Sequence, residues 1–227
     1  MIKEILSVFK SNTLMDRAFQ RSYDMLYLTH DMFIEARDVL RFTDTSELKT
    51  NIYDQDLEVN KYQREVRKDV FNHLVLTGTE DLPSGLVLVS IVIDLERIGD
   101  YTKNIFEIAL NHPKKLKGGI FEDRLVEIEK EVEENFKQTI QCFKNADEEL
   151  GREIVTKYKT VSKISDECLF DLIKEKDNSI LPGTAVALAL YFRSLKRINS
   201  HLRNISSSVV NPFHRIGYKV KKKKNKS

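Results

Sequence analysis

The sequence predicts an all-α protein built from two tandem three-helix bundles, with six long antiparallel helices. Three observations support this fold class. Apolar residues recur at intervals of three and four along most of the 227 residues, which is the period of an amphipathic helix. The chain holds only eight glycines and four prolines, whereas sheets need frequent turns. A Gly-Gly pair near the middle then separates the predicted helices into two sets.

The first half contains three predicted helices. They extend over about 5–40, 46–76 and 83–110. Thr45 and Ser46 suit the N-cap of the second helix, because a hydroxyl oxygen there accepts a hydrogen bond from a free backbone N–H. The third helix begins at a proline, which is favoured in the first turn.

The second half repeats this outline. Its helices extend over about 121–146, 148–176 and 182–210. Short connections imply antiparallel neighbours, so each half is predicted to form one bundle. The resulting boundaries are 1–113 for the first bundle, 119–210 for a second, degenerate bundle and 211–227 for a basic C-terminal tail.

An internal repeat supports the duplication. Leu95–Ile105 aligns with Leu195–Ile205 at an offset of 100 residues without a gap. Five of the eleven positions are identical, and both segments lie in the third predicted helix of their half. Identities at equivalent places in the helix order favour a duplicated bundle over chance.

Composition excludes several classes of protein. No apolar stretch approaches the roughly 18 residues of a membrane span, and the N-terminus lacks the pattern of a signal peptide. Cys142 and Cys168 have no metal-ligand spacing, so we expect a reduced, cytoplasmic protein. From Arg215 onward the chain carries seven basic residues and no acid, which leaves 30 basic and 35 acidic residues elsewhere. Specific nucleic-acid binding is therefore not expected of the acidic body.

The sequence gives little support for an enzyme. It has no G-x-S-x-G nucleophile motif and no glycine-rich loop of the kind that binds phosphates. None of the five histidines forms the Glu-x-x-His pair of a di-iron bundle. A binding protein is the prediction.

Oxygen-bearing side chains recur on two neighbouring helices of the first half. Glu96, Asp100 and Asn104 are spaced four residues apart, and Asp56 and Asn60 repeat that spacing one helix earlier. Side chains at this spacing share one helix face. If the two faces meet, they form an all-oxygen site for one divalent or trivalent cation, Mg, Mn, Fe or Ca.

The competing interpretation is a solvated acidic face, neutralised by Arg64, Arg97 and Lys103. One feature favours a more specialised role. Gly99 lies inside the helix, where glycine costs about 1 kcal/mol relative to alanine. Close helix approach or room for an ion would account for it.

The segment Asp94–Asp100, followed by Asn104 and Ile105, resembles the signature of PhoU proteins, the accessory regulators of bacterial phosphate uptake. Asp56–Asn60 is similar to the acidic stretch of that family's second helix. The resemblance implies two three-helix bundles, each with a Glu/Asp-x-x-x-Asp metal motif. It also implies action beside a membrane phosphate transporter or a membrane-bound sensor kinase.

The second half departs from this pattern. At the 100-residue offset, Lys196 takes the place of Glu96 and Ser200 that of Asp100. Two threonines, Thr156 and Thr160, stand at the positions equivalent to Asp56 and Asn60. A lysine ammonium has no lone pair to give a metal. We therefore expect one site at most, in the first bundle. The basic residues of the last helix either bind an anion or an acidic partner, or replace the lost metal structurally.

The basic tail has three interpretations. Lys221, Lys222, Lys223 and Lys224 form a solubilising end, a surface for the anionic face of a membrane, or a contact with nucleic-acid phosphates. The membrane interpretation suits the resemblance to PhoU and places the protein at the inner face of the membrane.

The leading hypothesis is a regulator of phosphate transport or phosphate signalling that binds a cation in its first bundle. It docks on a membrane transporter or a sensor kinase, and a homodimer is a further candidate assembly. The alternatives are a carboxylate-bridged metal-dependent enzyme and an accessory subunit of a sodium–phosphate symporter.

Overall fold

The computed structural model describes residues 13–44 and 51–220. All regular structure in these ranges is helical, which confirms the predicted all-α class. The helices are α2 (Leu14–Phe42), α3 (Ile52–Thr77), α4 (Leu82–Asn111), α5 (Glu122–Asn145), α6 (Glu148–Lys157), α7 (Lys159–Ile173) and α8 (Pro182–Val210), with 3-10 turns η1 (Gly119–Phe121) and η2 (Phe213–Arg215).

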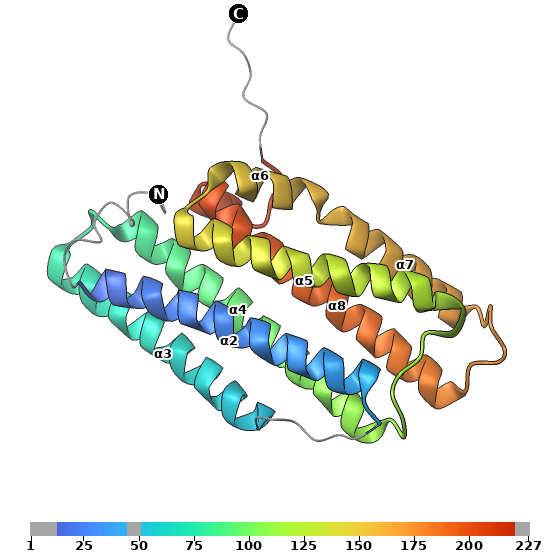
Figure 1. Cartoon of the computed structure of the whole chain (residues 1–227). Coiled ribbons are helices and arrows are strands. Elements are labelled where there is room, and N and C mark those ends of the chain that lie inside the picture. The colour runs from blue at the N-terminus through green and yellow to red at the C-terminus, as the bar shows by residue number, and fades with distance from the viewer. Residues whose placement is uncertain (1–12, 45–50, 221–227) are drawn as a thin grey trace, which may run out of the picture.

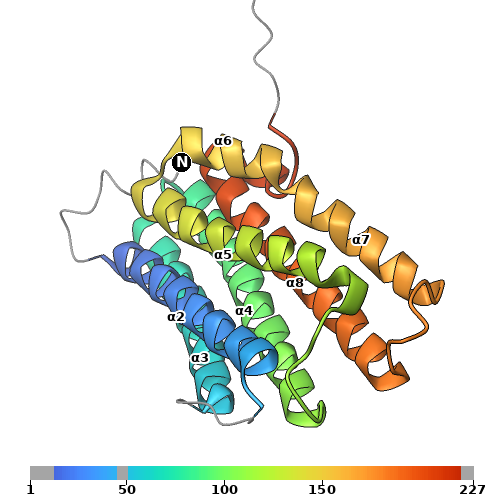
Figure 2. The same ribbon diagram turned by 45° about the vertical axis from the view of Figure 1, so that its right-hand side comes forward.

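The helices form two bundles that lie side by side (Figure 1). In the first bundle α2, α3 and α4 pack on one another, and in the second α5, α6 and α7 pack around α8. Two helix pairs join the bundles, α4 with α8 and α2 with α5. Figure 2 shows the two groups from a second direction, with α4 next to α8.

The core follows the predicted helical stripes. Leu95, Ile98 and Ile105 are fully buried in α4, and Leu195, Ile198 and Ile205 occupy the equivalent buried positions of α8. Repeated segments therefore bury the same face in both bundles, as expected when the same packing has been duplicated. None of the helices in the described ranges is long and apolar enough to cross a bilayer.

Local capping sets where two helices begin. The Thr13 hydroxyl accepts a hydrogen bond from the Asp16 backbone N–H at 3.1 Å, and the Asp16 carboxylate accepts one from the Thr13 N–H at 3.0 Å. This capping box starts α2 at Leu14, so the predicted start near residue 5 is wrong. At the start of α3 the Asn51 side-chain oxygen accepts a single hydrogen bond, from the Tyr53 backbone N–H at 3.0 Å. The predicted caps Thr45 and Ser46 lie outside the described residues.

The predicted fifth helix, over 148–176, is two helices that meet at Tyr158. The buried side chain of Asn199 on α8 donates a hydrogen bond to the Tyr158 carbonyl at 3.0 Å. The guanidinium of Arg203 also lies 4.0 Å from the centre of the Tyr158 ring. Contacts from α8 therefore meet the chain at the break, and the sequence of the fifth helix gives no sign of it.

Part of the predicted tail is folded. The segment 211–220 returns onto α8, where the Gly217 N–H donates to the Ser207 hydroxyl at 2.6 Å. The Asn211 amide donates to the carbonyls of Arg215 and Tyr218 at 3.1 and 2.8 Å. Lys221, Lys222, Lys223 and Lys224 lie outside the described residues, so the membrane and nucleic-acid interpretations remain predictions.

Two glycines near the helix ends of the second bundle have opposite surroundings. A Cβ on Gly151 would lie 2.9 Å from Val210 Cγ1 and 3.2 Å from the Ser206 carbonyl oxygen, whereas a Cβ on Gly183 would meet nothing within 4 Å. We expect Gly151→Ala to lower the free energy of unfolding by about 1–3 kcal/mol, because overpacking outweighs the helix propensity of alanine. Gly183→Ala should leave it unchanged or raise it by up to about 1 kcal/mol. Chemical denaturation of both variants tests the pair, and equal effects would contradict it.

Candidate functional site

The carboxylates of Asp56 on α3 and of Glu96 and Asp100 on α4 lie near one another where the two helices pack. The Lys103 ammonium lies between two of them, with its Nζ atom 2.9 Å from Asp56 Oδ2 and 3.6 Å from Asp100 Oδ1. The side chains of Asp56, Glu96 and Asp100 are 14%, 17% and 31% exposed. The three carboxylates therefore form one half-buried cluster, and none of them is fully exposed to solvent.

The pKa of Glu96 reflects the closeness of these acids. Burial raises the pKa of the Glu96 carboxyl, and the negative charges of Asp100 and Asp56 raise it further. The nearby guanidinium groups of Arg97 and Arg67 only partly oppose this rise. A carboxyl whose pKa is raised by its neighbours is one at which additional positive charge would be favourable.

Basic side chains already neutralise part of the cluster. Arg97 NH1 lies 3.0 Å from Asp100 Oδ2. Burial disfavours the Lys103 ammonium, but the hydrogen bond to Asp56 and the charges of Asp56 and Asp100 raise the pKa of Lys103 overall. These are the ion pairs that the acidic-face interpretation predicts for Arg97 and Lys103. Arg64, the third base, pairs with no other described residue.

The two asparagines are placed differently. Asn60 donates to the Asp56 backbone carbonyl at 2.9 Å, and its amide nitrogen lies 3.5 Å from Asp56 Oδ2. Asn104 lies on another side of α4, in a cavity between α4 and α8. Gly99 lies against α3, where a Cβ would be 3.2 Å from Val59 Cγ1. Close approach of the two helices therefore accounts for a glycine inside α4.

The cluster differs from a formed metal site. In residues 13–44 and 51–220, no group of three or more His, Cys, Asp or Glu side chains has a metal-binding arrangement. The donors are nonetheless of one chemical kind, carboxylate oxygens, which hard cations prefer. Two of them, Asp56 and Asp100, flank the Lys103 ammonium, itself a monovalent cation. A metal ion fits this donor set only if Lys103 moves aside.

The equivalent positions of the second bundle hold an internal ion pair. Lys196, which replaces the first acid of the motif, lies 2.6 and 2.7 Å from the two carboxylate oxygens of Asp166 on α7. The Ser200 hydroxyl bonds the Lys196 carbonyl of its own helix. Thr156 bonds the Arg152 carbonyl in the same manner. These contacts agree with a structural replacement of the metal motif.

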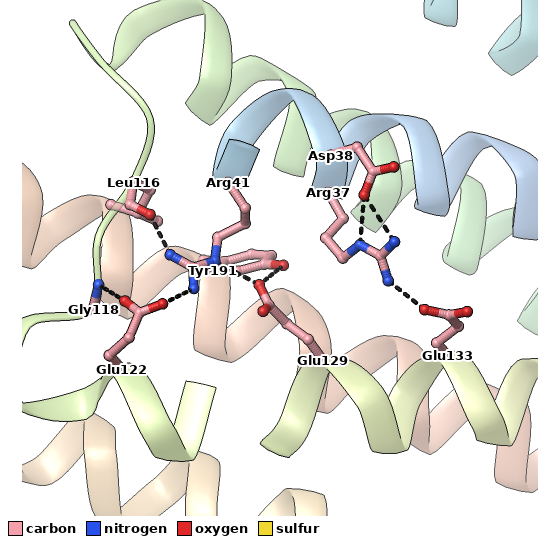
Figure 3. Close-up of polar contacts among 9 residues, drawn as sticks. All are labelled: Arg37, Asp38, Arg41, Leu116, Gly118, Glu122, Glu129, Glu133 and Tyr191. Carbon is pink, nitrogen blue, oxygen red and sulfur yellow. Dashed lines mark hydrogen bonds and ion pairs between the residues drawn. The ribbon is translucent and has the colours of Figure 1, made fainter. Parts of the chain in front are cut away.

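A buried polar network joins the two bundles, and the sequence analysis did not identify it (Figure 3). Arg41 at the end of α2 donates to Glu129 of α5 at 2.8 Å, to the Leu116 carbonyl and to Glu122. The Tyr191 hydroxyl of α8 donates to the same Glu129 oxygen at 2.7 Å. Arg41 thus links α2 to α5 and to the segment that connects the two bundles.

Burial perturbs the groups of this network. It raises the pKa of Glu129, and the charge of Arg41 and the hydrogen bond from Tyr191 only partly offset it. A sequence signal existed for Glu129, because it falls beside the apolar stripe Leu125, Ile128 and Val132 of an otherwise amphipathic helix. An acid beside a core stripe indicates a buried partner, although it does not identify one.

Asp94, two residues before Glu96 on α4, also joins the bundles. Its Oδ1 atom lies 2.7 Å from His201 Nδ1 and accepts a hydrogen bond from the Asn204 amide at 2.9 Å. The His201 ring stacks on Tyr101 of α4 with ring centres 5.9 Å apart. The helix α4 therefore carries the acidic cluster on one side and contacts α8 with another.

Known proteins resemble this chain in sequence and in fold. The PhoU domain matches twice, over residues 23–109 and 125–209. A "Phosphate-specific transport system accessory protein PhoU homolog" of Synechocystis sp. is 23% identical over 176 residues, which cover 74% of this chain and 75% of the relative. A protein of the same description from Pseudomonas putida is 29% identical over 174 residues, covering 73% and 66%.

Two solved structures share the fold. PhoU from Pseudomonas aeruginosa superposes with a TM-score of 0.78 at 21% identity, covering 86% of this chain and 95% of that one. The phosphate transport system regulatory protein PhoU from Streptococcus pneumoniae gives 0.71 at 16% identity, covering 86% and 92%. The two sequence matches coincide with the two bundles and together span most of the chain. The chain belongs to the PhoU family.

Proposed function

We propose that this protein regulates phosphate transport or phosphate signalling and that it acts as an accessory protein, without catalysis of its own. The observation that carries the proposal is the double match to the PhoU domain across both bundles. The relatives from Synechocystis and P. putida are described as accessory proteins of phosphate-specific transport systems. That kinship supports docking of this chain on a membrane phosphate transporter or its sensor kinase, at the cytoplasmic face.

The cation part of the proposal rests on the α3–α4 cluster. A divalent or trivalent cation would bind Glu96 and Asp100 of α4 and Asp56 of α3, taking the place of the Lys103 ammonium. Carboxylates bind such cations in competition with protons. Because the pKa of Glu96 is raised, cation binding should weaken as the pH falls through that pKa.

A bound cation would act on the surface that α4 offers to a partner. It would neutralise the acids, fix α3 against α4 and free Lys103 from its ion pairs. Since Asp94 ties α4 to His201 and Asn204 of α8, a change in α4 also reaches the second bundle. The expected effect is a difference in partner affinity between the two states, set by how differently the partner binds them.

The variant Glu96→Gln/Asp100→Asn tests this site. We expect it to lose at least about tenfold in affinity for Mn²⁺ or Mg²⁺, because two of the three carboxylates are removed while the fold is kept. Isothermal titration calorimetry of the purified full chain measures the affinity. The matched control is Glu149→Gln/Glu153→Gln, an exposed acidic pair of the same spacing on α6.

Three outcomes separate the hypotheses. Loss of metal together with weaker co-purification of the phosphate transporter or sensor kinase supports regulation through the cation. Unchanged metal binding and partner binding in the double variant would leave the acids as a salt-bridged surface and would overturn the cation proposal. Oxygen consumption or hydrolysis by the metal-loaded native chain would instead support a carboxylate-bridged enzyme.

A further inference from the structure

The cavity between α4 and α8 lies on another side of α4 from the acidic cluster. It has a volume of about 630 Å³ and runs between the C-terminal half of α4 and the N-terminal half of α8. Its apolar lining comes from Ile108 of α4, from Val186, Ala187 and Leu190 of α8, and from Leu181, the residue before α8. Three of these, Leu181, Val186 and Leu190, are 72%, 60% and 53% exposed. Contiguous exposed apolar side chains beside a cavity are typical of a binding site.

The ends of the cavity are chemically different. The helices α4 and α8 are antiparallel, since Asp94 contacts His201 at one level and His112 contacts Thr184 at another. Tyr101 and Asn104 of α4 therefore lie level with Arg193 of α8. At the opposite end His112 is already hydrogen-bonded to Thr184 at 3.2 Å. The Tyr101 hydroxyl, the Asn104 amide and the Arg193 guanidinium make no hydrogen bond with any other described residue.

These three groups are suited to an anion. Arginine donates paired N–H groups to a carboxylate or phosphate, and the phenol and amide add further donors. The cavity also contains Glu107, about one helical turn beyond Asn104 in the direction of Leu181. Its carboxylate would repel an anion in the middle of the cavity, so a negative head group is favoured at the Arg193 end.

The shape limits what the apolar part can hold. Along α8 the lining runs from Leu181 to Ser194, about 20 Å, so the empty volume between the side chains, about 1310 Å³ with adjoining solvent included, corresponds to a mean cross-section of about 65 Å². An α-helix with its side chains, 10–12 Å across, has a cross-section of about 80–110 Å² and would enter only by its edge. An extended peptide would bring unpaired backbone N–H and C=O groups against apolar side chains, which is costly. A single hydrocarbon chain has neither problem.

We propose that the α4–α8 cavity binds a single-chain amphiphile, with its anionic head at Arg193, Asn104 and Tyr101 and its hydrocarbon chain along Ile108, Ala187 and Leu190. The head is a carboxylate or a phosphate monoester, because both accept the same donors. The ligand class is thus a fatty acid or a monoacyl phosphate. This site shares no residue with the acidic cluster.

Calorimetry with three ligands of equal chain length tests the head group. Dodecanoate, dodecyl phosphate and dodecyltrimethylammonium are titrated below their micellar concentrations into the full chain, and native mass spectrometry gives the stoichiometry. We expect one anionic ligand per chain and at least tenfold weaker binding of the cationic one. The tighter of the two anions identifies the head. Absence of anionic binding, or equal binding of the cation, overturns the proposal.

Two substitutions test the location. Leu190→Glu places a charge in the apolar part at a half-exposed position and should abolish binding, while Val75→Glu, 67% exposed on α3, should not affect it. Arg193→Gln should weaken only the anionic ligands, by about tenfold, whereas Arg64→Gln on the exposed face of α3 should leave all affinities unchanged. If Leu190→Glu and Val75→Glu behave alike, binding is not in this cavity and the proposal fails.

Discussion

Arg41→Met is expected to lower the free energy of unfolding by about 3–5 kcal/mol. The substitution removes the only basic side chain among the described residues that contacts the buried Glu129 carboxylate, and it leaves that charge without an ion-pair partner. The Glu129 side chain is 6% exposed and cannot recover its hydration. The Tyr191 hydroxyl remains, but a single neutral donor does not replace a guanidinium. Chemical denaturation of the full chain measures the loss.

The loss should depend on pH. Burial already raises the pKa of Glu129 and Arg41 opposes that rise, so in Arg41→Met the folded-state pKa lies further above the unfolded value. A carboxyl of this kind contributes stability below its unfolded pKa, and the contribution disappears as the pH rises through the folded pKa. The deficit of the variant should therefore be greater at pH 8 than at pH 5.

Arg152→Met is the matched control for this experiment. Arg152 makes an exposed pair with Glu148 one helical turn away on α6. Its removal should change the free energy of unfolding by less than about 0.5 kcal/mol at either pH. If Arg41→Met behaves like this control, the buried network does not hold the bundles together.

Asn199→Ala is expected to lower the free energy of unfolding by about 2–4 kcal/mol, since two buried polar groups lose their partner. The Asn199 amide oxygen accepts from Asn135 at 2.8 Å, and its nitrogen donates to the Tyr158 carbonyl at 3.0 Å. Both asparagines are nearly inaccessible. Hydrogen exchange should become faster at the α6–α7 junction and stay unchanged in α3 and α4.

Ser200→Ala, at the next position of α8, is the control for Asn199. The Ser200 hydroxyl bonds only the Lys196 carbonyl of its own helix, so its loss should cost less than about 0.5 kcal/mol. An Asn199→Ala chain with native stability and unchanged exchange around Tyr158 would show that the break between α6 and α7 does not depend on this side chain.

Much of the acidic site could be predicted from spacing, but its limits could not. Glu96 and Asp100 share a helix face at four residues apart, and the structure brings both close to Asp56. Asn104 follows the same spacing, yet it lines the α4–α8 cavity. A helix turns about 100° per residue, so a residue eight positions along is displaced by about 80°. Whether that displacement leaves it in the site depends on the neighbouring helix.

The sequence by itself determined the helical class, the division into two sets of helices and the buried faces of α4 and α8. These follow from the periodic spacing of apolar residues and from glycine and proline, which act within a few residues along the chain. The equivalence of Leu95–Ile105 and Leu195–Ile205 likewise needed only the sequence.

Only the tertiary structure decided which charges are buried and where the predicted fifth helix is interrupted. Arg41 and Glu129 are 88 residues apart and become partners because α2 packs on α5. At the break, the Tyr158 carbonyl accepts a hydrogen bond from Asn199, 41 residues away, and the α4–α8 cavity lies where the two bundles meet. Such interactions depend on which helix faces lie against each other, and that arrangement results from packing the whole chain, which local periodicity does not encode.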